Sequence, residues 1–169
     1  MRISGFTLLE ILVVIAIIGI LASLATLSFR DLVTRYRVEN QIQRLYSDLM
    51  NFRLNAMHRS RTCFFVLSDY SYKGYEDSHP SPFGNDELDQ GQDNLILQET
   101  RFDFPFSFSS TGIITFDSRG FSKTNATICV FSNVRPNYDC LKISRSKISL
   151  GKIKEISGNC TGANCEDKE

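Results

Sequence analysis

A single carboxylate lies at the start of the most apolar part of this 169-residue chain. Glu10 is followed by an uncharged run from Ile11 to Phe29. A carboxylate near the middle of a membrane-spanning helix costs about 2.5–3.5 kcal/mol, and somewhat less near an end, so such a group usually has a cationic partner and a task. No cation lies within helical reach of Glu10. We therefore expect its partner to come from another chain or from a newly formed N-terminal amine.

The cysteines are the second set of reactive side chains. All five lie beyond the apolar run, at Cys63, Cys129, Cys140, Cys160 and Cys165. Their clustering in an exported domain predicts disulfides. Cys129 and Cys140 flank an expected hairpin, and Cys160 and Cys165 could close a C-terminal loop, but the pairing cannot be deduced from sequence. One thiol must be left over, and Cys63, in an apolar segment, is the candidate. A zinc site is disfavoured because the chain has no C-x-x-C pair.

Catalytic chemistry has little support in this sequence. The chain has two histidines, His58 and His79, and no tryptophan. It has no phosphate-binding loop, no nucleophile elbow and no metal-binding histidine pair. We expect no enzyme activity, no cofactor and no metal site. The formal net charge of zero also excludes a general polyanion-coating protein, although a local basic patch is compatible with it.

A long helix is expected to position Glu10. The uncharged run of 19 residues, Ile11 to Phe29, would be about 28 Å long as a helix, close to the hydrocarbon thickness of a bilayer. The helix can continue, because no proline occurs before Pro80 and no glycine lies between Gly19 and Gly74. Helical spacing then gives residues 31–58 one apolar stripe, formed by Val38, Ile42, Leu45, Leu49, Phe52 and Ala56. We expect this stripe to pack on the chain's own globular head.

The head after His58 is predicted to consist of short strands. The expected strands are Cys63–Leu67, Leu95–Leu97, Ile113–Phe116, Thr127–Ser132, Leu141–Ser144 and Lys147–Leu150. Between the first two, residues 69–92 are rich in turn-forming residues and predict a long loop. Alternating phenylalanines from Phe102 to Phe108 predict one aromatic face, at an edge or a bulge because of Pro105. The fold class is therefore α+β, with a long N-terminal helix packed on an antiparallel sheet.

The N-terminal junction carries a family resemblance. Residues Gly5 to Glu10 read Gly-Phe-Thr-Leu-Leu-Glu, directly before the apolar run. This resembles the leader junction of the type IV pilin and type II secretion pseudopilin superfamily. The resemblance implies that a prepilin peptidase cuts after Gly5 and methylates Phe6, and that Glu10 neutralises the N-terminal amine of a neighbouring subunit. It implies a leader (1–5), a transmembrane and filament-core helix (6–29), an amphipathic continuation (30–58) and a β-rich head (59–169).

Looser motifs in the head resemble one branch of this superfamily, the FimT/FimU-like minor pilins and the GspH-type pseudopilins. They are the segment Asn55–Ser60, the segment Ile114–Phe116 followed by Gly120, and the segment Cys140–Ser144. The branch implies a structural minor pilin that assembles into or primes a type IV pilus, with other pilins and the prepilin peptidase as partners. The alternative is a GspH-type pseudopilin of the type II secretion system. Either would be a single-pass protein of the bacterial inner membrane with its head in the periplasm.

Two observations oppose that interpretation of the N-terminus. Arg2 with the small residues Ser23 and Ala25 also fits a secretory signal peptide, although a charged Glu10 inside the apolar region is unusual for one. The distribution of arginines also conflicts with the expected orientation, because the positive-inside rule would place the head in the cytoplasm. Only Arg2 precedes the apolar run, whereas four follow it, at Arg30, Arg35, Arg37 and Arg44.

Charge is unevenly distributed along the head. Residues 142–154 hold five bases and no acid: Lys142, Arg145, Lys147, Lys152 and Lys154. Some FimT-like pilins bind DNA through a Gly-Arg-x-Arg motif near this hairpin, where this chain has Ser-Lys-Ile-Ser at 146–149. DNA binding is therefore the third interpretation. In contrast, residues 76–103 hold eight acids and one base. Calcium is a candidate ligand there, but the spacing does not match an EF-hand, and a solvated loop is expected.

Overall fold

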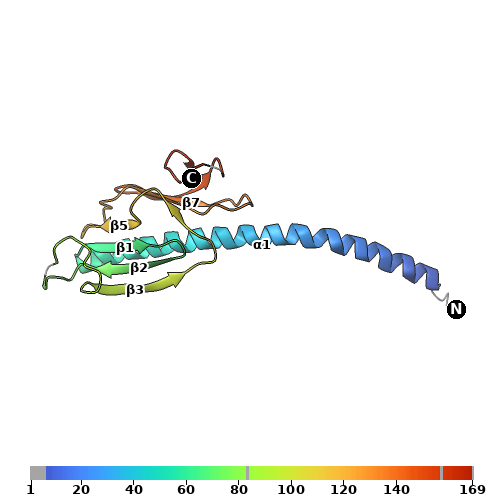
Figure 1. Cartoon of the computed structure of the whole chain (residues 1–169), viewed down its shortest axis with the longest axis horizontal. Coiled ribbons are helices and arrows are strands. Elements are labelled where there is room, and N and C mark those ends of the chain that lie inside the picture. The colour runs from blue at the N-terminus through green and yellow to red at the C-terminus, as the bar shows by residue number, and fades with distance from the viewer. Residues whose placement is uncertain (1–6, 83, 157, 169) are drawn as a thin grey trace.

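The computed structural model describes residues 7–82, 84–156 and 158–168, with the backbone alone for residues 24–28. One helix, α1 (Leu8–Arg59), runs through 52 residues. It begins at Thr7, whose side chain accepts a hydrogen bond from the Glu10 N–H, and ends at Ser60, which adopts the left-handed conformation. The N-terminal half of α1 projects alone from the head, and the C-terminal half lies along it (Figure 1). The expected continuous helix is confirmed.

The head contains two antiparallel sheets. The first has the strand order β3-β2-β1-β5, with β1 (Cys63–Leu67), β2 (Ser71–Glu76), β3 (Asn94–Arg101) and β5 (Ile113–Phe116). The second has the order β4-β6-β7-β8-β9, with β4 (Ser107–Phe108), β6 (Ala126–Cys129), β7 (Cys140–Ile143), β8 (Ile148–Ile153) and β9 (Cys165–Asp167). The predicted α+β class is confirmed.

Side chains from both sheets pack on the predicted stripe of α1. All six stripe residues, from Val38 to Ala56, are at most 2% exposed. They share one core with Phe65, Ile114 and Leu141. The core of the described residues begins at Val38, and every described side chain from Leu8 to Leu32 is exposed. A head fragment of residues 31–169 therefore retains the whole core and is expected to fold without the N-terminal part of the helix.

The prediction missed two strands, β2 and β9. Strand β2 lies inside the segment that was expected to be a loop. The sequence did not reveal it because its inward-facing residues, Tyr72, Gly74 and Glu76, do not form an apolar pattern. Gly74 is needed there, since a Cβ would overlap the Phe52 ring of α1. Of the alternating phenylalanines, only Phe108 lies in a strand, the short β4, which is at the edge of its sheet as expected, and Phe106 packs in the core from a loop. Strand β9 was not predicted, and its three residues carry little sequence signal.

Candidate functional sites

The N-terminal site is only partly described. Gly5 and Phe6 lie outside the described residues, and Glu10 lies in the first turn of α1 with its side chain exposed. No described residue forms a hydrogen bond or an ion pair with the Glu10 carboxylate. Thr7 uses its hydroxyl oxygen, 3.3 Å from the Glu10 backbone nitrogen, to cap the helix. The carboxylate thus remains available to a group from outside this part of the chain.

The expected membrane anchor is incompletely described, since nothing is described of side chains 24–28 in its C-terminal half. In the part of the chain that the structure describes, no helix is long and apolar enough to cross a bilayer.

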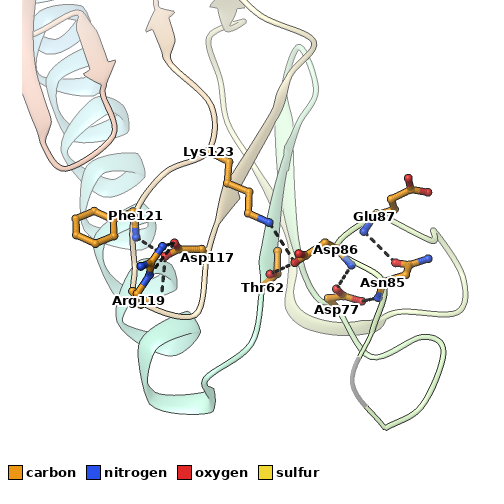
Figure 2. Close-up of polar contacts among 9 residues, drawn as sticks. All are labelled: Thr62, Asp77, Asn85, Asp86, Glu87, Asp117, Arg119, Phe121 and Lys123. Atoms are coloured by element: carbon orange, nitrogen blue, oxygen red, sulfur yellow. Dashed lines mark hydrogen bonds and ion pairs between the residues drawn. The ribbon is translucent and has the colours of Figure 1, made fainter.

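The acidic loop between β2 and β3 uses its carboxylates to hold its own backbone. Asp77 accepts hydrogen bonds from the backbone N–H groups of Asn85 and Asp86. Asp93 accepts three more, from residues 78, 79 and 89. Figure 2 shows Asp77 bound to the loop at residues 85 and 86, with the Glu87 side chain turned away. These bonds explain why acids accumulate in a loop without regular pairing.

A second contact ties the acidic loop to the rest of the head. The Asp86 carboxylate accepts a hydrogen bond from the Thr62 hydroxyl and lies 3.1 Å from the Lys123 ammonium. Both contacts lower the pKa of Asp86, with the Thr62 hydrogen bond as the larger cause. Among the described residues, no group of three or more potential metal ligands comes together.

The five bases of residues 142–154 do not form one surface. Lys142 is directly opposite Ser149 in the β7–β8 ladder, so these two residues share a face. Lys152 is three residues further along β8 and therefore faces the opposite side. Lys142 also lies 3.4 Å from the Asp167 carboxylate. Arg145 and Lys147 lie at the connecting turn and Lys154 lies beyond β8, all three exposed.

Arg145 belongs to a different cluster, which sequence reasoning missed. Its guanidinium lies 5.9 Å from the Phe121 ring, and that of Arg119 lies 5.7 Å from the same ring. Asp117 holds this turn by accepting hydrogen bonds from the Arg119 and Phe121 N–H groups (Figure 2). The contact with Arg145 joins residues more than 20 positions apart, and it depends on the fold.

Four cysteines are joined in two disulfides, Cys129–Cys160 and Cys140–Cys165. The sequence left the pairing open, and no disulfide joins Cys129 to Cys140 across the hairpin or Cys160 to Cys165 within the C-terminal loop. Cys129 and Cys140 are directly opposite in the β6–β7 ladder, yet each bonds to the C-terminal segment. The two bridges thus attach residues 160–165 to the second sheet.

Cys63 is free and buried, and burial raises the pKa of its thiol to about 12, so it is a poor nucleophile.

A buried carboxylate lies beside these disulfides. Asp139 is 6% exposed, and its Oδ1 accepts a hydrogen bond of 2.5 Å from the Ile153 N–H. Burial raises the pKa of Asp139 from 3.8 to about 6, against smaller opposing effects that include the Ile153 hydrogen bond and Lys152. The folded protein therefore binds the proton more tightly than the unfolded chain, so this group's contribution to stability decreases as pH rises from about 4 to 6.

We expect the Asp139→Asn variant to lose this pH dependence. Between pH 4 and pH 7 the free energy of unfolding of the wild-type head should contain a decrease of about 2–3 kcal/mol from Asp139, and the variant should lack it. Urea unfolding of residues 31–169 at several pH values measures the difference. Asp103→Asn, at an exposed position, is the control and should keep the wild-type profile. Identical profiles for wild type and Asp139→Asn would contradict the assignment.

Together these features define a class of protein. A long N-terminal helix, with a carboxylate in its first turn that no described residue pairs with, packed on an antiparallel β head, is a pilin-like α+β architecture. Comparison with protein families adds that residues 1–26 match the prokaryotic N-terminal methylation motif. That motif supports a type IV pilin-like protein, processed by a prepilin peptidase, with a structural role. Neither the curated proteins nor the solved structures gave a match.

Proposed function

We propose that this chain is a minor type IV pilin of the FimT-like kind. It is cut after Gly5, methylated at Phe6, and held in the bacterial inner membrane by residues 6–29. The amphipathic segment 30–58 and the head 59–169 then lie in the periplasm. The subunit enters or primes a pilus when its Glu10 carboxylate pairs with the Phe6 amine of a neighbour.

The methylation motif at residues 1–26 supports this proposal most strongly, because it overlaps a helix whose Glu10 carboxylate has no partner among the described residues. The exposed apolar surface of α1 from Leu8 onward adds support, because exposed apolar surface of this extent needs lipid or other helices to cover it. The two disulfides fit a periplasmic location.

A GspH-type pseudopilin of type II secretion is the second candidate, and it would use the same N-terminal chemistry. A clean deletion strain, assayed in parallel for surface pili and for secreted proteins, separates the two. Scarce pili with normal secretion are expected for the minor pilin. Normal pili with secreted proteins retained in the periplasm would instead assign the chain to the secretion system.

DNA binding has weaker support than either candidate. The five bases of residues 142–154 are divided between two faces and a turn, and Lys142 lies against Asp167. The exposed Arg145 beside Phe121 is the feature that favours nucleic acid, since basic and aromatic groups combine in such sites.

A further inference from the structure

A groove lined by arginines lies where the head meets the projecting part of α1. It has a volume of about 310 Å³ and is lined by Arg37, Asn40, Gln41, Arg44, Arg101, Phe102 and Asp103. The β3 arrow in Figure 1 points toward the N-terminal end of the molecule, and the groove residues 101–103 begin at the last residue of that strand. The groove therefore lies at the end of the head that is nearest to the projecting part of α1, which we call the base of the head.

The wall of this groove is held rigidly. Gln41 is buried, and its amide nitrogen donates to the Phe104 carbonyl at 2.7 Å. The Phe104 N–H donates back to the Gln41 carbonyl oxygen at 3.1 Å. This double contact fixes the segment after β3 against α1, and with it the positions of Arg101 and Phe102.

Positive charge in the groove is poorly compensated. Arg37 and Arg44 form no ion pair with any described residue, and the Arg44 guanidinium lies 5.7 Å from the centre of the Phe102 ring. Arg101 contacts Glu99 through Nε alone, at 3.3 Å, and its side chain is 80% exposed. Its two terminal nitrogens are therefore available. The three guanidinium groups outnumber the two nearby carboxylates, Asp103 in the groove wall and Glu99 on Arg101, and they suit an oxyanion that can accept paired hydrogen bonds.

The charge continues down the helix toward the apolar segment. Arg30, Arg37 and Arg44 are spaced by seven residues, so they follow one face of α1 with little drift. Arg37 lies eight residues, or about 12 Å, beyond Phe29. Arginine side chains are long, and membrane helices are tilted by about 20° on average. Both factors bring Arg30 and Arg37 within reach of a membrane surface, whereas Arg44, about 22 Å beyond Phe29 along the helix, reaches it when the head leans toward the bilayer.

Another copy's acidic loop would be the competing occupant. Its carboxylates, however, are largely engaged within their own head. Asp77 and Asp93 accept backbone hydrogen bonds, and Asp86 contacts Thr62 and Lys123. Asp89 accepts a hydrogen bond from the Asn85 side chain, and in Figure 2 the Glu87 carboxylate points away from these contacts.

We propose that the arginine groove docks the base of the head onto the phosphate groups of anionic phospholipids. This inference rests on the proposed membrane anchor. Arginines next to a membrane helix are attracted to an anionic surface, and docking would hold the head against the bilayer until the subunit is extracted for assembly. It would also give a role to arginines that contradict the positive-inside rule.

Tryptophan fluorescence can test this docking, because the natural chain has no tryptophan. The full chain carrying Phe102→Trp is reconstituted in vesicles of phosphatidylcholine, with or without about one third phosphatidylglycerol, and a headgroup nitroxide lipid serves as quencher. We expect quenching to be at least about twofold stronger with phosphatidylglycerol, and the difference to shrink in about 0.5 M salt. Asn40→Trp, at an exposed position in the groove, provides a second reporter if the first variant does not fold.

Matched variants identify the groove as the contact. Arg37→Gln with Arg101→Gln should reduce quenching to the phosphatidylcholine level, whereas Lys147→Gln with Lys154→Gln removes equal charge elsewhere and should have no effect. Equal quenching in the two lipids would overturn the proposal, as would an equal effect of both double variants. A response to inorganic phosphate without dependence on anionic lipid would also overturn it. The assay requires neither cleavage nor a filament, so its failure would leave the proposed pilin function intact.

Discussion

Replacement of Glu10 by leucine is expected to prevent the chain from entering filaments while the head remains folded. The carboxylate has no described partner within its own chain, and the apolar surface around it requires a dry environment. An unpaired ammonium of a neighbour would remain buried after the replacement, which is strongly unfavourable. We expect the amount of subunit in sheared filaments to decrease by more than about tenfold, a loss of about 1.4 kcal/mol or more in assembly.

Two further variants of Glu10 separate the effect of the side chain's charge from the effect of its length. Glu10→Gln keeps the length of the side chain but not its charge and should fail like leucine, whereas Glu10→Asp should assemble in part. Total cellular subunit and the Cys129–Cys160 and Cys140–Cys165 disulfides should be unchanged in all three variants. Normal incorporation of Glu10→Leu into filaments would show that the carboxylate has no role in assembly.

Replacement of Gly151 by alanine is expected to disrupt the disulfide that crosses strand β8. A Cβ at this position would lie 2.6 Å from the Glu166 carbonyl oxygen and 2.7 and 3.0 Å from the sulfurs of Cys165 and Cys140. Strand β8 pairs with β7 on one side and with β9 on the other, so it cannot move away from the new methyl group without losing hydrogen bonds to one of these strands. We expect a loss of about 2–5 kcal/mol in the free energy of unfolding, which combines overpacking with a lost or weakened bridge.

Two measurements on the head fragment check this expectation. Urea unfolding gives the stability, and thiol titration of the denatured protein counts free cysteines, with only Cys63 free in the wild type. Gly151→Ala should release additional thiols. Gly162→Ala is the control, because a Cβ there meets its nearest atoms at ordinary distances of 3.6 and 3.8 Å. Wild-type stability and thiol count for Gly151→Ala would contradict the packing described for β8.

Sequence reasoning succeeded where the evidence was local. The spacing of Val38, Ile42 and their successors predicts the buried stripe, because helical periodicity alone determines which side chains share a face. The stripe is confirmed by its burial. The odd cysteine was also placed correctly in an apolar strand at Cys63. Both inferences depend on neighbours a few residues apart.

Sequence reasoning did not predict the contacts between segments that are distant along the chain. The disulfide partners are separated by 31 and 25 residues, and their pairing could not be deduced from the sequence. The arginine groove joins Arg37 and Arg44 of α1 to Arg101, a contact that no spacing rule predicts. The acidic loop shows a different failure. Its composition suggested solvated charge or a cation site, whereas Asp77 and Asp93 satisfy backbone N–H groups that the loop leaves without partners.

The mature N-terminus tests the central claim most directly. The chain is purified from the membranes of cells that contain the prepilin peptidase, and mass spectrometry determines its first residue and any modification. We predict a chain that begins at Phe6 and carries one methyl group on its amine. A chain that still begins at Met1, or one cut after Ala25 as a secretory signal peptide would be, would contradict the account.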